Sequence, residues 1–171
     1  LSDEQKARLR EINKELGLLD IKFGGNVLAE TNAYQKWIDN EQELDGLPQD
    51  VKNAAAEEAA AAGQPGKWLF TTQKSSFIPV LQYCTNRQLR KELLIAYTMR
   101  GNNNNEYDNK SVINQTVRLR VEKAKMFGFD NPADMILETS MANYSKNVMD
   151  FLPSVWEPSL AQAKKEAAEL Q

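Results

Sequence analysis

The apolar residues near the start of the chain recur every three or four positions, which is the spacing of one face of an α-helix. They are Leu9, Ile12, Leu16, Leu19 and Phe23. At strict heptad spacing this stripe would reach the polar residues Asn26 and Glu30. A straight helix drifts from the heptad, and its stripe moves instead to Val27, Thr31 and Tyr34. The pattern therefore predicts one long helix over about residues 3–31, with an apolar face that needs a large partner surface.

Capping signals divide the rest of the chain into further elements. Ser2 with Gln5 and Thr85 with Gln88 match the capping box, and Asn131 is followed by Pro132 at the first helical position. The expected helices span about 3–31, 48–62, 75–84, 86–100, 110–128, 132–141 and 146–170, and the expected strands about 33–39 and 67–72. Pro153 and Pro158 are expected to interrupt the last helical segment.

These elements predict a mainly α fold, a long-helix bundle with a minor two-stranded β-ribbon, in a single helical domain over residues 1–171. Over residues 111–127 a second apolar stripe recurs at helical spacing. Its members are Val112, Ile113, Val117, Val121, Ala124 and Phe127. The aromatic positions Tyr34, Trp37, Trp68 and Trp156 are expected to include some that solvent reaches.

Two adjacent glycines, Gly24 and Gly25, lie within the predicted long helix. A phosphate-binding loop would need a preceding strand, a helix start and a Walker or G-x-G-x-x-G spacing, none of which is present. We therefore interpret the pair as a place of close helix packing or of a local bend.

Two other polar stretches have a functional and a plain interpretation. Residues 101–109, "GNNNNEYDN", carry oxygen ligands in a run but lack the order of a calcium-binding loop, which favours a solvated, mobile loop. A basic cluster on the helix that follows is most simply a solvated face. It consists of Arg118, Arg120, Lys123 and Lys125.

Composition excludes several classes of function. The chain has no histidine, so it lacks an H-E-x-x-H zinc site, a Ser-His-Asp triad and a Cys-His pair. Cys84 is the single cysteine and is interpreted as a buried thiol, while Glu57, Glu58 and Glu92 are interpreted as surface charges. The net charge of −3 gives no electrostatic reason to expect binding to nucleic acid or to an anionic membrane. No catalytic, metal-binding or cofactor-binding residue is therefore assigned.

Three stretches together resemble a known family over nearly the whole chain. They are "FGGNVLAETNAYQKWID" followed by "ELDGLP", then "WLFTTQKSSFIPVLQYCTNRQLRKELLIAYTMRG", then "NKSVINQTVRLRVEKAKMFGFDNPADM". The second contains the most specific part, the "NRQLR…AY…R" pattern from Asn86 to Arg100. The chain resembles an N-terminal, non-catalytic helical fragment of the thimet oligopeptidase family, and is closer to its bacterial peptidyl-dipeptidase branch.

The resemblance implies a parent zinc metallopeptidase that cleaves short peptides in a deep channel between two largely helical lobes. In that family two histidines of H-E-x-x-H and a downstream glutamate hold the zinc, and this chain contains none of that motif. We expect a helical wall of the channel, inactive alone, whose partner is the remainder of the peptidase with its catalytic lobe. The chain begins with "LSDEQ", so it is expected to be a piece of a longer protein, in the cytoplasm or alternatively the periplasm. The alternative is a stand-alone helical interaction module that pairs through the Leu9–Phe23 stripe.

Overall fold

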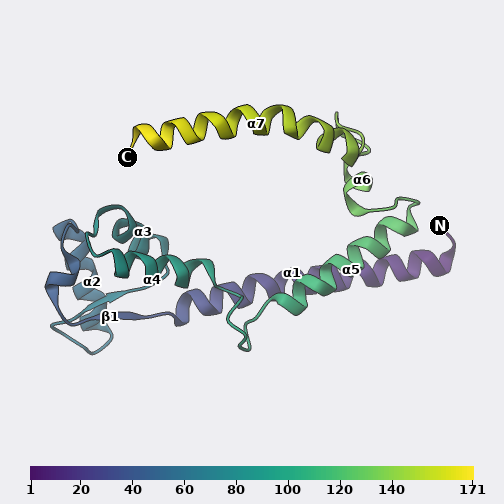
Figure 1. Cartoon of the computed structure of the whole chain (residues 1–171). Helices are drawn as coiled ribbons and strands as arrows, with labels where there is room; N and C mark the ends of the chain where they lie inside the picture. The colour runs from purple at the N-terminus through teal and green to yellow at the C-terminus, as the bar shows by residue number, and fades with distance from the viewer. The chain divides into compact units, whose positions relative to one another are not determined.

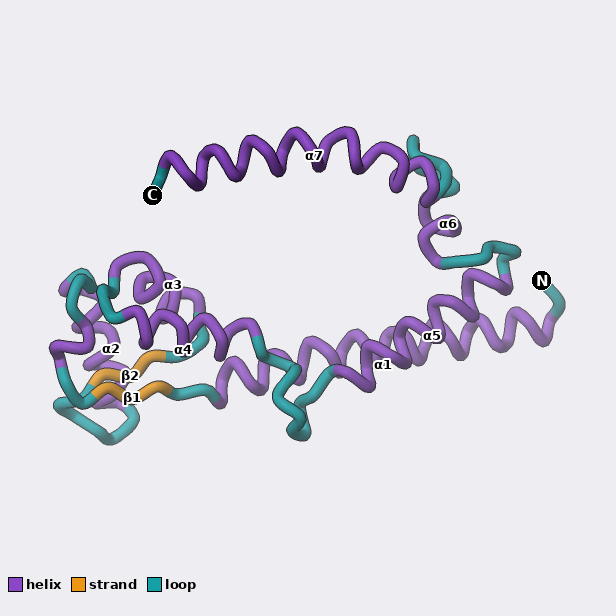
Figure 2. The backbone as a smooth tube through the Cα atoms, viewed as in Figure 1, coloured by secondary structure: helices purple, strands orange, loops and turns teal.

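A computed structural model describes all of residues 1–171, and it is mainly helical with one small sheet (Figure 1). The elements are α1 (Asp3–Ala33), β1 (Lys36–Ile38), the short 3-10 helix η1 (Glu41–Leu44), α2 (Gln49–Ala61), β2 (Trp68–Phe70), α3 (Lys74–Tyr83), α4 (Arg87–Thr98), α5 (Lys110–Met126), α6 (Pro132–Leu137) and α7 (Ser145–Glu169). The predicted fold class, helices with a minor two-stranded ribbon, is confirmed (Figure 2). No helix combines the length and the apolar composition needed to cross a membrane.

The chain divides into two compact units, which are described separately. One comprises residues 1–16 and 115–171, and the other comprises residues 17–114. The division falls within α1 and within α5. The expectation of a single domain over residues 1–171 stays a prediction.

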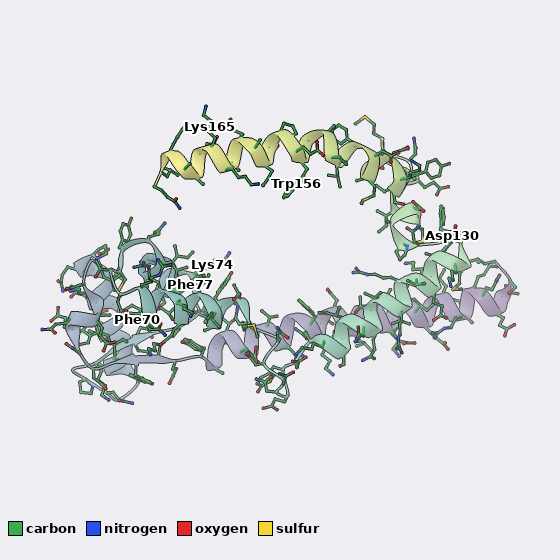
Figure 3. The ribbon with its side chains drawn as sticks, viewed as in Figure 1. Phe70, Lys74, Phe77, Asp130, Trp156 and Lys165 are labelled. Atoms are coloured by element: carbon green, nitrogen blue, oxygen red, sulfur yellow. The ribbon has the colours of Figure 1, made fainter.

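The unit of residues 17–114 is built on the β-ribbon and the helices that cover it. β1 and β2 pair in antiparallel fashion, with Trp37 opposite Leu69, and α2 packs against β2. The core joins residues from these strands, η1, three helices and the adjoining turns, namely Ile38, Leu44, Leu47, Ala55, Phe70, Phe77, Val80, Cys84, Leu89 and Leu93. Phe70 and Phe77 both lie in this core (Figure 3), and Phe77 stacks on Tyr97 with 4.2 Å between the ring centroids. The ribbon therefore gains its stability from the helices, because two strands alone are marginal.

One glycine in this core region has a clear steric role. Gly46 has a φ of +87°, and a Cβ at this position would lie 2.3 Å from the carbonyl oxygen of Tyr83. The turn after η1 can therefore approach the end of α3 only with glycine here. The backbone N–H of Thr85 then donates to the carbonyl of Asp45 at 2.8 Å, which holds the two segments together.

The other unit contains the start of α1, the second part of α5, and helices α6 and α7. Arg8 of α1 pairs in bidentate fashion with Glu122 of α5, at 2.7 and 2.9 Å, and Lys123 donates to Asn13 at 2.8 Å. Ile12 is fully buried in this unit. The N-terminus of α1 has the predicted capping box, since the Gln5 N–H donates to the hydroxyl of Ser2.

The predicted cap of α4 is wrong by one residue. The N-cap is Asn86, whose side-chain oxygen accepts from the N–H groups of Gln88 and Leu89 at 3.1 and 3.2 Å. The hydroxyl of Thr85 donates instead to the carbonyl of Asp45 at 3.1 Å. The long-range contact between the turn after η1 and the end of α3 uses Thr85, so the neighbouring asparagine caps the helix. The other cap is confirmed, because Asn131 accepts from the N–H of Asp134 at 2.9 Å.

The predicted interruption of the last helix is also wrong. α7 runs without a break from Ser145 to Glu169 and contains both Pro153 and Pro158. A proline removes one hydrogen bond to the carbonyl four residues earlier. Since α7 has no buried residue, water can satisfy the carbonyls left without a donor.

The stripe expected over residues 111–127 is only partly buried. Val112 and Ala124 are buried, but Ile113, Val117 and Phe127 are each about half exposed, at 49, 53 and 46%. Leu119, which was not in the predicted stripe, is buried instead. It lies seven residues after Val112, on the same side of α5.

Candidate functional site

The best-defined polar arrangement surrounds Glu30, near the end of α1. Glu30 is only 7% exposed, and its carboxylate accepts hydrogen bonds from three groups of the loop that follows α4. They are the backbone N–H of Gly101, the amide of Asn103 at 3.0 Å from each oxygen, and the amide of Asn105 at 2.6 Å. We call Glu30, Gly101, Asn103 and Asn105 the Glu30 cluster. It ties a long helix to a loop about seventy residues later in the chain.

A second polar contact supports the same loop. Asn109, 2% exposed, accepts from the amide of Asn26 at 2.9 Å and donates to the carbonyl of Phe23 at 3.2 Å. Its backbone N–H donates to the carbonyl of Gly101 at 2.7 Å, which closes the loop. Gly101 has a φ of +74°, and a Cβ there would lie 2.7 Å from the Asn109 amide nitrogen. Glycine is therefore required for the backbone to turn its N–H toward Glu30.

The electrostatics of the Glu30 cluster favour an ionised carboxylate. Burial raises the pKa of Glu30, but the hydrogen bonds from Asn103, Gly101 and Asn105 act in the other direction and bring it below its usual value. The charge is thus stabilised by N–H donors and not by a cation. No buried side-chain nitrogen or oxygen in the chain lacks a hydrogen-bond partner.

The asparagine-rich loop is exposed over residues 102–106, as the sequence predicted, but hydrogen bonds hold several of its side chains in place. Besides the contacts to Glu30, Asp108 accepts from the N–H of Asn104 at 2.8 Å and pairs with the ammonium group of Lys110, also at 2.8 Å. The side chain of Lys110, followed by backbone N–H groups, lowers the pKa of Asp108 to about 2. The Asn103 and Asn105 amides act as donors toward a carboxylate, so their nitrogens and not their oxygens point at the anion. No three potential metal ligands of the His, Cys, Asp and Glu types come together in the chain.

A shallow groove lies beside the Glu30 cluster, between the end of α1 and the end of α4. Its volume is about 460 Å³. The residues that line it are Glu30, Ala33, Tyr34, Ile95, Ala96, Met99, Arg100, Asn103, Asn105 and Tyr107. Arg100 donates to the carbonyl of Tyr97 at 2.9 Å and to the hydroxyl of Thr31 at 2.6 Å, and its guanidinium lies 3.8 Å from the Tyr97 ring centroid. The carboxylate of Glu30 already accepts hydrogen bonds from three groups, so at this edge of the groove it holds the loop that follows α4.

The other residues considered from the sequence lie apart from this arrangement. Gly24 and Gly25 are within the continuous helix α1, and a Cβ at either position would meet nothing within 4 Å. The expected close helix packing at this pair is therefore wrong for this chain. In the basic cluster, Arg118, Arg120 and Lys125 are exposed as expected, and only Lys123 makes a contact, to Asn13.

Cys84 and Glu92 both have structural partners. Cys84 is 2% exposed, as predicted for a buried thiol, and its sulfur donates to the carbonyl of Glu43 at 3.4 Å. Glu92 of α4 forms an ion pair with Lys36 of β1, with 2.5 Å between the charged atoms. This pairing lowers the pKa of Glu92 and raises that of Lys36. The pair joins α4 to the edge of the ribbon.

Sequence reasoning missed the Glu30 cluster, although one signal for it was present. Asn26 and Glu30 occupy the positions that the apolar stripe would reach at strict heptad spacing, and both are used for buried or partly buried hydrogen bonds. Two polar residues in register with an apolar stripe indicate a polar contact at the end of that stripe. The four consecutive asparagines of residues 102–105 are the other half of this contact.

The known proteins that this chain resembles are all peptidases. The model of Peptidase family M3 matches residues 80–171, just over half of the chain. Over the whole chain, oligopeptidase A of Haemophilus influenzae is 39% identical, and the match covers 26% of that relative. The probable cytosolic oligopeptidase A of Arabidopsis thaliana is 34% identical over 94% of the chain and 24% of its own length. Dipeptidyl carboxypeptidase of Salmonella typhimurium is 28% identical over the whole chain and 25% of its own length. The chain thus spans about a quarter of the length of the curated relatives that it matches.

Proposed function

Because this chain belongs to peptidase family M3, we propose that it is a non-catalytic, helical part of a zinc-dependent oligopeptidase that cleaves short peptides. The observation that carries the proposal is the family match over residues 80–171 in a chain without histidine. The matched relatives are about four times as long as the chain, which leaves room for a catalytic part elsewhere in the parent protein.

The residues of this chain do not fit the zinc ion that the family implies. The sequence has no histidine, and no three potential ligands of the His, Cys, Asp and Glu types lie together. Tetrahedral zinc sites in enzymes use three protein ligands, most often including histidine. We therefore assign zinc, and the activation of water, to the remainder of the parent and derive no catalytic step from this chain.

The role that we assign to this chain is mechanical. α1 has 31 residues, so it spans about 46 Å at about 1.5 Å per residue. The Glu30 cluster and the Arg8–Glu122 pair each hold α1 to another part of the chain with charge-assisted hydrogen bonds. Stiff helices of this kind suit the wall of a channel that admits flexible peptides and excludes folded proteins.

Within the family, we assign the parent to the oligopeptidase A branch. The identity to oligopeptidase A of H. influenzae is 39%, against 28% to the dipeptidyl carboxypeptidase of S. typhimurium. The peptidyl-dipeptidase branch expected from the sequence motifs is less well supported by these values. We propose a cytoplasmic parent, in line with the A. thaliana relative that is named as cytosolic.

Peptide hydrolysis tests the proposal directly. The 171-residue chain with added zinc is expected to show no turnover of a quenched fluorescent octapeptide, whereas the full-length parent is expected to cleave it and to lose activity with a chelator. Turnover by the purified chain that a substitution within it abolishes would overturn the proposal. The alternative, an interaction module, would be favoured by a parent that lacks hydrolysis altogether.

A further inference from the structure

A run of exposed apolar side chains lies on α7. None of the residues of this helix is buried. Five large apolar side chains are exposed, namely Met149 at 65%, Phe151 at 64%, Leu152 at 48%, Val155 at 45% and Trp156 at 63%. Trp156, which projects from α7 in Figure 3, confirms the expectation that solvent reaches some of the aromatic residues.

The apolar residues of α7 form one wide face. At about 100° per residue, the apolar side chains between Val148 and Leu160 occupy an arc of about 180°. Lys146, Asp150, Ser154 and Glu157 lie on the opposite side of the helix. We call the apolar side, formed by Val148, Met149, Phe151, Leu152, Val155, Trp156 and Leu160, the α7 face. An arc of this width is typical of a helix that covers a hydrophobic core, since a coiled-coil seam is narrower.

The heptad pattern argues against pairing of α7 with a second copy. Counted in sevens from Met149, one seam position carries Trp156, Ala163 and Leu170. The other seam position carries Leu152 but then the polar residues Ser159 and Glu166. A two-stranded coiled coil needs apolar residues at both seam positions, so the seam fails after its first heptad.

The charges of α7 argue against a membrane surface. The helix carries three lysines (Lys146, Lys164, Lys165) and four acidic residues (Asp150, Glu157, Glu166, Glu169). Helices that lie on anionic membranes have more basic than acidic residues on the polar face. α7 has no such excess of basic residues. The occupant of the α7 face is therefore expected to be an apolar protein surface.

The two prolines within α7 are a further reason to expect a protein surface that covers this helix. Each of Pro153 and Pro158 removes a helical hydrogen bond in a helix that has no fully buried residue. Most helical stability in proteins comes from the packing of an apolar face, so an unpacked helix with two internal prolines frays readily. A covering surface would supply the missing stabilisation.

We propose that the α7 face packs onto an apolar protein surface in the remainder of the parent oligopeptidase, a proposal that rests on the proposed function. The matched region of the family model includes all of α7, and about three quarters of each relative lies outside the match to this chain. The parent is thus long enough to supply the surface. α7 is then the element that couples this helical part to the rest of the enzyme.

Hydrogen–deuterium exchange tests this docking. Amides of residues 148–160 are expected to exchange at least about 100-fold more slowly in the full-length parent than in the 171-residue chain, because packing suppresses local opening. Equal exchange in the two proteins would overturn the proposal. So would a stable dimer of the 171-residue chain with these amides protected.

Paired variants locate the contact on the α7 face. In the parent, Leu152→Gln and Trp156→Gln are expected to lower the melting temperature by several degrees, while Glu157→Gln on the polar side leaves it unchanged. In the 171-residue chain all three are expected to leave it unchanged. Equal effects of the apolar and polar variants in the parent would overturn the docking. Peptide hydrolysis by the unaltered parent is measured separately, so a loss of the proposed function is distinguished from a failure of the docking proposal.

Discussion

At the scale of single residues, Glu30 shows how a helix can bury a carboxylate without a cationic partner. Three N–H donors from one loop surround it, and the backbone of Gly101 can supply one of them only because glycine tolerates a φ of +74°. A buried charge that is fully hydrogen-bonded is stable, whereas one that loses its donors or its charge leaves polar groups unpaired. The stability of the Glu30 cluster should therefore fall when the carboxylate is replaced by a neutral group of the same shape.

The substitution Glu30→Gln tests this sensitivity. The glutamine removes the charge and turns one acceptor oxygen into a donor facing other donors, so a loss of about 2–3 kcal/mol in the free energy of unfolding is expected. Urea unfolding followed by circular dichroism measures it. Asp20→Asn, an exposed carboxylate on the same helix, is the control and should change stability by less than about 0.5 kcal/mol. Similar effects at the two positions would contradict the assigned role of Glu30.

The pKa of Glu30 leads to a prediction about pH. The folded-state pKa is lowered, so the folded protein binds fewer protons at this site than the unfolded chain does. The stabilisation is therefore present above the unfolded value of about 4.3 and is lost as the pH falls through the folded-state pKa. The stability difference between the wild type and Glu30→Gln should then shrink between pH 6 and pH 3, measured as urea midpoints. A difference that stays constant over this range would show that the charge of Glu30 is irrelevant.

At the scale of elements, the N-terminus of α4 differs from the capping box predicted from the sequence, because Asn86 and not Thr85 caps the helix. Asn86→Ala removes the acceptor for two N–H groups and should cost about 1 kcal/mol in unfolding free energy. Thr85→Ala removes one exposed hydrogen bond to Asp45 and should cost less. Chemical denaturation of both variants gives the order. The reverse order would restore the capping box predicted from Thr85 and Gln88.

Most elements could be predicted from the sequence because their signals are local. Periodicity and caps predict α1 from its start at Asp3, and Asn131 with Pro132 predicts the start of α6. Contacts between distant residues could not be predicted in the same way. Thr85 donates a hydrogen bond to Asp45, and Glu30 accepts hydrogen bonds from a loop about seventy residues later in the chain. Local helix propensity predicts neither contact. The interruption expected at Pro153 failed because a proline weakens a helix without always ending it.

At the scale of the whole molecule, the burial of the Leu9–Phe23 stripe bears on the choice between a structural part of a peptidase and a stand-alone interaction module. Ile12 in this stripe is fully buried, and Leu9, Leu16 and Leu19 are half-buried. Only Phe23, at 42%, is exposed. Most of the stripe is thus already used for packing inside the chain, which leaves little of it to pair with another protein.

The substitution Ile12→Ala tests whether the stripe stabilises the fold of this chain or pairs with another protein. Deleting most of a fully buried isoleucine side chain should lower the free energy of unfolding by about 2–4 kcal/mol and leave the sedimentation coefficient of the folded chain unchanged. Leu18→Ala, where the leucine of α1 is 58% exposed, is the matched control and should change stability by less than about 0.5 kcal/mol. A module that pairs through the stripe would behave in the opposite way, because its partner helix and not its own fold would depend on Ile12. Dissociation of a dimer by Ile12→Ala, with little change in monomer stability, would therefore favour the interaction module over the channel wall.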